Sequence, residues 1–139
     1  AIPCPGALSL DDKTLLDMVD CLLVHVRDCI DKQAINKYLE LIWKVVSASN
    51  VYFTAQEPWA LKMTDPARMA TVLYVTADAI RQISILSQPI MPNSAAKLLN
   101  TLNIPINERG FEYLGCVHRI TSKNSIEKPQ GVFPRFIEP

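Results

Sequence analysis

The sequence has little of what most catalytic sites require. Its four glycines form neither a P-loop nor a dinucleotide-binding fingerprint, so the backbone cannot easily wrap a phosphate. The four cysteines include no CxxC pair, and neither His25 nor His118 has metal-ligand spacing around it. No nucleophile with a neighbouring base and no paired carboxylates occur at a convincing spacing. We therefore predict that this chain holds no catalytic residue, no metal and no cofactor.

An excess of charge of either sign is also absent. The 14 basic and 14 acidic side chains cancel, which argues against the broad positive field of a non-specific DNA-binding protein and leaves only local nucleic-acid contacts. No apolar run approaches the roughly 18 residues that a membrane span needs, and no signal peptide is evident. The sequence predicts a soluble protein without a DNA or membrane partner, whose cysteines are reduced and mostly buried.

The first long apolar pattern follows a helix start signal. Ser9 with Asp11 and Asp12 combines an N-cap side chain with negative charge near the unpaired N–H groups of a first turn. Apolar residues then recur at three- and four-residue spacing as far as Ile30, which predicts one amphipathic helix. The aspartates of this segment are interpreted as a solvated face without function; they are Asp11, Asp12, Asp17, Asp20, Asp28 and Asp31.

Two further long helices are bounded by proline. A second apolar pattern begins at Ile35 and should end near Glu57, because the following Pro58 lacks an N–H and its ring restricts the residue before it. The run Thr64-Asp65-Pro66 places a capping residue before a proline at the first helical position, which predicts a third helix that ends before Pro89.

The last part of the chain changes character. A fourth, short helix is predicted to begin at Pro92 and to end before Asn103 and Pro105. Beyond it, glycine and proline recur too often for a helix, and residues 132–136 look extended. The predicted fold is all-α, an antiparallel bundle of three main helices plus a short fourth, with residues 1–8 as an initial loop and 104–139 as an extended C-terminal tail.

Residues 50–62 mix residue types that suit RNA recognition. An unstacked base offers a face on which Trp59 can stack, for about 1–3 kcal/mol, and polar edges that Asn50 and Gln56 can hydrogen-bond. The alternative is that Trp59 plugs the end of the core and that Asn50 braces the next loop. Trp43 lies within an apolar stripe and is predicted to be a core residue.

The chain resembles the anticodon-binding domain of bacterial and organellar methionyl-tRNA synthetases. The matching motifs are Asn50-x-Tyr52-Phe53-x-x-Gln56-Glu57-Pro58-Trp59-Ala60-Leu61, Asp65-Pro66-Ala67-Arg68, Arg81 and Gln88-Pro89-Ile90-Met91-Pro92. Similarity in residues 3–12 and 132–135 extends the resemblance over nearly the whole chain. Its most specific part is the Gln-Glu-Pro-Trp sequence.

The resemblance implies a class I synthetase that activates methionine with ATP and transfers it to the tRNA whose anticodon is CAU. It implies that Trp59 stacks on an anticodon base and that Asn50 and Pro58 shape the pocket. From their side chains, Asn50 and Gln56 are the candidate readers of base edges. Arg81 also matches an arginine of similar sequences, and it either touches RNA or ties helices together.

The chain departs from that family in what it lacks. The catalytic signatures that hold ATP are absent, so the chain alone should be inactive, with tRNA(Met) and the catalytic domain of the same synthetase as its partners. The family's first bundle helix would lie before Ala1, which suggests a fragment, a cleaved product or a separate subunit.

The expected location is the cytoplasm, with the mitochondrial matrix as the alternative. The tail is expected either to pack across the junction with the catalytic half or to cover the bundle. The alternative function for the whole chain is a protein-interaction domain that binds no RNA.

Overall fold

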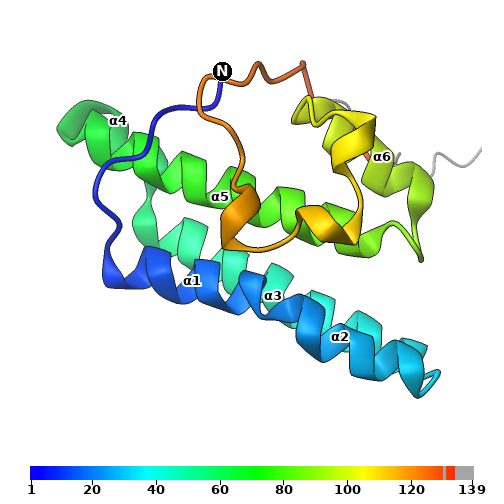
Figure 1. Cartoon of the computed structure of the whole chain (residues 1–139). Helices are drawn as coiled ribbons and strands as arrows, with labels where there is room; N and C mark the ends of the chain where they lie inside the picture. The colour runs from blue at the N-terminus through cyan, green and yellow to red at the C-terminus, as the bar shows by residue number, and fades with distance from the viewer. Residues whose placement is uncertain (130, 134–139) are drawn as a thin grey trace, which may run out of the picture.

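The computed structural model describes residues 1–129 and 131–133, and within them it contains helices and no strand (Figure 1). The α-helices are α1 (Leu10–Asp20), α2 (Leu22–Asp31), α3 (Ile35–Gln56), α4 (Pro58–Thr64), α5 (Pro66–Ser87) and α6 (Pro92–Thr101). Three short 3-10 turns follow, η1 (Ile106–Glu108), η2 (Phe111–Tyr113) and η3 (Cys116–His118). The predicted all-α class is confirmed.

The start of α1 is as predicted, but its continuation is not. The Ser9 hydroxyl accepts the backbone N–H of Asp12 at 3.3 Å, and the Asp12 carboxylate accepts that of Ser9 at 2.8 Å, so the two residues form a capping box. The prediction of one helix as far as Ile30 is wrong, because the helix is interrupted at Cys21. The break lets α1 pack on both α3 and α5, while α2 packs on α3.

The boundaries of α3 and α5 agree with the prolines that predicted them. α3 ends at Gln56, and the next residue, Glu57, takes a left-handed conformation with φ 44° and ψ 56°. The sequence predicted no helix between Glu57 and Asp65, whereas the structure begins a further short helix, α4, at Pro58. The Asp65 carboxylate then caps α5 by accepting the backbone N–H of Arg68 at 2.9 Å.

α5 is the central helix and contacts α1, α3, α4 and α6 (Figure 1). Contrary to the expectation from the sequence, it is long and apolar enough to span a membrane by length and composition, but 61% of its most apolar window is buried inside the bundle. α5 is therefore apolar because it is the core helix of the bundle.

The described tail lies against the bundle in three 3-10 turns joined by irregular backbone, so the predicted extended tail is only partly right (Figure 1). Ile120 is 3% exposed, and the N-terminal segment pairs with the tail through Ile2, whose N–H and C=O bond to the backbone of Asn124 and Lys123. This part covers the bundle's own surface. Packing across a junction with another domain stays a prediction, and of residues 132–136 only the first two are described.

Two predictions about burial are wrong. Three cysteines, Cys4, Cys21 and Cys116, are exposed and only one is buried. Trp43 is 57% exposed instead of lying in the core. The residues of α3 that face the core are Tyr38, Ile42, Val45, Ser49 and Tyr52. Trp43 follows Ile42, so it is rotated by about 100° from that face.

Candidate nucleic-acid interface

Trp59 stands on the surface at the corner between α3 and α4. Its side chain belongs to the first turn of α4 and is 59% exposed. The indole meets the ring of Phe53 edge to face, with 6.1 Å between ring centroids and 61° between planes. Phe53 is half-buried and packs against the main core. The indole is therefore supported on one side and open to solvent on another, so it does not plug the end of the core.

Two other predicted site residues belong to the same corner. Asn50 is exposed on α3, one turn before Phe53 and on the same side of the helix. Pro58 is buried as the first residue of α4. Its fixed φ suits that position and determines where the helix carrying Trp59 begins.

Gln56 is already bonded at both ends of its amide. Its Oε1 accepts a hydrogen bond from Arg68 Nη2 at 2.6 Å, and its Nε2 donates to Asp11 Oδ2 at 3.2 Å. These bonds fix the orientation of the amide, which keeps one N–H and one oxygen lone pair for a further partner. The structure thus places Gln56 in a network beneath the corner.

The centre of that network is Asp12, which is 0% exposed. Arg68 approaches its carboxylate with two nitrogens, Nη1 to Oδ2 at 2.5 Å and Nη2 to Oδ1 at 2.8 Å. The Tyr52 hydroxyl donates to Oδ1 at 2.6 Å. We call Asp12, Tyr52, Gln56 and Arg68 the Asp12 network. The prediction that Asp12 belongs to a solvated face is wrong, because its partners lie 40 and 56 residues away along the chain.

Hydrogen bonding determines the ionisation of this network. Burial by itself raises the pKa of the Asp12 carboxyl, but the bonds from Arg68, Tyr52 and the Ser9 backbone lower it from 3.8 to about 2. The Tyr52 hydroxyl has a pKa well above its usual value, because it is buried and donates to the Asp12 carboxylate. The bond to Asp12 likewise raises the pKa of Arg68. At neutral pH the network therefore contains a carboxylate, a guanidinium and a neutral phenol.

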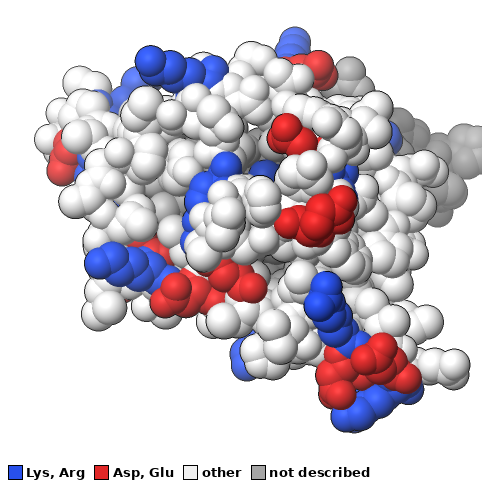
Figure 2. All heavy atoms as spheres, viewed as in Figure 1, with Lys and Arg blue, Asp and Glu red and all other residues white. Residues whose placement is uncertain are grey.

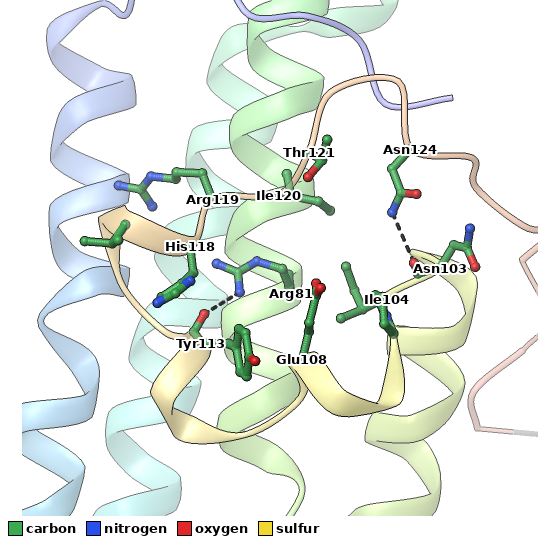
Figure 3. A pocket seen from close by; sticks show the side chains of 12 residues that line it. Arg81, Asn103, Ile104, Glu108, Tyr113, His118, Arg119, Ile120, Thr121 and Asn124 are labelled. Carbon is green, nitrogen blue, oxygen red and sulfur yellow. Dashed lines mark hydrogen bonds between the residues drawn. The ribbon is translucent and has the colours of Figure 1, made fainter.

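Arg81 lies elsewhere and is 3% exposed. Its Nε donates to Asp78 Oδ1 at 3.0 Å and its Nη1 to the carbonyl of Tyr113 at 2.7 Å. Arg81 lines a cavity of about 720 Å³, and Figure 3 shows it there beside Tyr113 and His118 of the tail. Arg81 therefore ties α5 to η2, and its prediction as an RNA-binding residue is not supported by its position.

The charges around the corner are mixed. Figure 2 shows basic and acidic groups interspersed on the visible face, without a broad positive area. Lys62 is exposed on α4, three residues after Trp59, so a local positive charge lies beside the indole. Within the described residues, no group of three His, Cys, Asp or Glu side chains is placed to hold a metal ion.

The chain matches the family described as the anticodon binding domain of methionyl tRNA ligase over residues 2–138. It belongs to this family. A methionine-tRNA ligase of Rhizobium meliloti (strain 1021) is 48% identical over 138 residues, which cover 99% of this chain and 27% of that ligase. The corresponding ligase of Brucella suis biovar 1 (strain 1330) is 45% identical over 137 residues, covering 99% of this chain and 26% of the ligase.

Solved structures of methionyl-tRNA synthetase share the fold of this anticodon-binding domain. The apo form of the Mycobacterium tuberculosis enzyme superposes with a TM-score of 0.93 at 39% identity, covering 99% of this chain and 28% of that one. The same enzyme bound by methionyl-adenylate gives a TM-score of 0.91 at 39% identity, over 96% of this chain and 27% of that one. The chain thus spans about a quarter of the length of the relatives it matches.

Proposed function

We propose that this domain recognises the anticodon loop of tRNA(Met) as part of a methionyl-tRNA ligase. The observation that carries the proposal is the indole of Trp59, which is 59% exposed yet held against Phe53 in a domain of this family. A large aromatic ring that is supported but not covered is suited to stacking on an unpaired base.

Each residue of the corner has a distinct role in this proposal. Trp59 stacks on an anticodon base, and Asn50 bonds to the edge of a base. Pro58 shapes the pocket from below by setting the start of α4. Lys62 adds a charge for a nearby phosphate, as a point charge on a flexible stem. The domain has a net charge of zero, so it has no general electrostatic attraction to RNA. Selectivity for the tRNA then depends on the few contacts that these residues make with bases.

The chemistry belongs to the parent enzyme in this proposal. Methionine activation with ATP and transfer to tRNA take place on the catalytic domain, which is the second partner of this chain. The domain contributes binding energy and selection of the correct tRNA. The bacterial relatives favour the cytoplasm as its location, with the mitochondrial matrix as the alternative, and the family match gives no support to a protein-interaction domain without RNA.

The test is the binding of fluorescent anticodon stem-loops, with CAU or a changed anticodon, to the domain and to the full ligase. We expect Trp59→Ala to weaken binding of the CAU hairpin by about 5-fold to 150-fold, which corresponds to the roughly 1–3 kcal/mol of base stacking. Trp43→Ala is the matched control, because Trp43 is similarly exposed, at 57%, but lies more than three turns before the end of α3. Equal binding of both hairpins with a steep salt dependence, or an unchanged affinity of Trp59→Ala, would refute the proposal.

A further inference from the structure

We propose that Arg68 and Gln56 are positioning residues for Trp59, holding α4 in place so that the indole is oriented before RNA arrives. This inference rests on the proposed function of Trp59. It assigns Gln56 a role different from the reading of base edges, and it assigns a role to Arg68, whose contacts lie below the corner and not on its surface.

Arg68 holds both ends of the segment that contains α4. Before α4, the Oε1 of Gln56 accepts a hydrogen bond from Arg68 Nη2 at 2.6 Å. After α4, the carboxylate of Asp65 accepts the backbone N–H of Arg68 at 2.9 Å. The bond between Gln56 and Arg68 closes a loop of the chain with a sequence separation of 12 residues, and Trp59 lies inside it. Closing a short loop in this way restricts the conformations open to everything within it.

Arg68 can hold this loop because it is itself anchored. An arginine side chain has about 2 kcal/mol of rotamer entropy, so a free guanidinium would not fix anything. Here its two terminal nitrogens bond to the carboxylate of Asp12, which is 0% exposed and also accepts the hydroxyl of Tyr52. A bidentate pair of this kind has a defined geometry as well as a favourable energy. The loop is thereby attached to α1 and α3 at once.

The backbone transmits this restraint to the indole. Between Gln56 and Trp59 lie only Glu57, in its left-handed conformation, and Pro58, which is buried and has a fixed φ. The position of the Gln56 backbone therefore sets the first turn of α4 and with it the placement of the indole against Phe53. A binding site that is ordered in advance loses less entropy when its ligand binds, which increases affinity.

Two substitutions of Gln56 separate positioning from base reading. Gln56→Ala removes the acceptor for Arg68. Gln56→Glu, made together with Asp11→Asn so that two carboxylates do not face each other across the 3.2 Å contact, keeps an oxygen there but removes the amide N–H that a base edge would use. Positioning predicts that Gln56→Glu retains the wild-type preference for CAU, whereas Gln56→Ala weakens CAU binding about fivefold, as expected for the loss of one hydrogen bond. Base reading predicts that both variants lose the preference.

The motion of the indole is the second measurement. In a Trp43→Phe background Trp59 is the single tryptophan, so its time-resolved fluorescence anisotropy reports the local freedom of α4. We expect Gln56→Ala and Arg68→Lys to increase this freedom and Gln56→Glu to preserve it. Lysine cannot bond to Asp12 and Gln56 together in the forked geometry of arginine. Asp11→Ala, which removes only the exposed contact to Gln56 Nε2, and Arg27→Lys on the surface of α2 are controls expected to match the parent.

The outcomes test the positioning role of Gln56 and Arg68 separately from the proposed function of Trp59. Wild-type anisotropy and CAU affinity in Gln56→Ala would overturn the positioning role, and so would a loss of CAU preference in Gln56→Glu while the indole stays held. If Arg68→Lys fails to fold by circular dichroism, Gln56→Ala still provides the test, because it leaves the Asp12 pair intact. If Trp59→Ala changes nothing, the proposed function itself fails. If Trp59→Ala weakens binding and Gln56→Ala does not, only the positioning role fails.

Discussion

At the scale of single residues, Asp12 shows how a buried carboxylate is kept ionised. Four donors reach it, the backbone N–H of Ser9, the Tyr52 hydroxyl and two nitrogens of Arg68. The cost of removing a charge from water is therefore offset by hydrogen bonds at both carboxylate oxygens. The same residue completes the capping box of α1, so one side chain serves both a local and a long-range structure.

The depressed pKa of Asp12 predicts acid sensitivity with a definite sign. Its folded-state pKa of about 2 lies below the usual 3.8, so ionised Asp12 stabilises the fold above pH about 4, and this stabilisation is lost as the pH falls toward 2. The difference corresponds to about 2 kcal/mol. Urea unfolding at pH 5 and pH 2 should show the loss in the parent, and Asp12→Asn should have a smaller pH dependence. Asp31→Asn, at an exposed position of α2, serves as control, and a slope shared by all three proteins would contradict the prediction.

At the scale of elements, the corner between α3 and α4 depends on the left-handed backbone of Glu57. A side chain with a Cβ atom costs roughly 1–2 kcal/mol in this region, where glycine has little cost. The conformation persists because α4 begins at Pro58, directly after Glu57, so this single residue makes the whole connection between the two helices. The strain lies immediately before the helix that carries Trp59.

This conformation predicts an inversion of the usual order of alanine and glycine. Glu57→Gly should be more stable than Glu57→Ala by about 1 kcal/mol, because only glycine takes the left-handed region without a steric cost. At Ser47, exposed in the middle of α3, alanine should instead be more stable than glycine by about 1 kcal/mol. Chemical unfolding of the four variants measures both differences. The same order at both positions would show that Glu57 is not left-handed in solution.

At the scale of the whole molecule, one arginine of the tail connects it to two helices. Arg119 Nη1 donates to Asp20 Oδ1 at 2.8 Å and to Asp78 Oδ2 at 2.7 Å, and its Nη2 donates to Asp20 Oδ2 at 2.5 Å. Burial lowers the pKa of Arg119, but these bonds outweigh it and raise the pKa. Ile120 follows with its backbone N–H on Asp78 at 2.9 Å. The tail is thereby joined to α1 and α5.

Removing this connection should loosen the tail more than the bundle. We expect Arg119→Ala to lower the free energy of unfolding by about 2–3 kcal/mol, less than for a fully buried pair because the Arg119 side chain is 22% exposed. Trypsin should also cleave faster after Lys123, whose backbone N–H bonds to Ile2 in the intact tail. Lys97→Ala on the surface of α6 is the control. Unchanged cleavage and stability in Arg119→Ala would show that Arg119 does not hold the tail.

The sequence by itself determined the starts of α1 and α5, the end of α3 and the family to which the chain belongs, but neither the break between α1 and α2 nor α4. The N-cap at Ser9, the cap at Asp65 and the proline at position 58 act on their immediate neighbours, so the pattern predicts them directly. The Gln-Glu-Pro-Trp sequence likewise indicated the corner that carries Trp59. The roles of the corner residues in RNA binding stay predictions.

The tertiary structure alone decided which faces and charges are buried. It exposed Trp43, buried Arg81, and paired Asp12 with Arg68 across 56 residues of sequence. The physical reason is that helix signals depend on backbone groups within a few residues, whereas the burial of a side chain depends on which other helices pack against it. An aspartate on an apparent solvated face and an aspartate at the centre of a network have the same local sequence pattern, and only the packing of α1 against α3 and α5 distinguishes them.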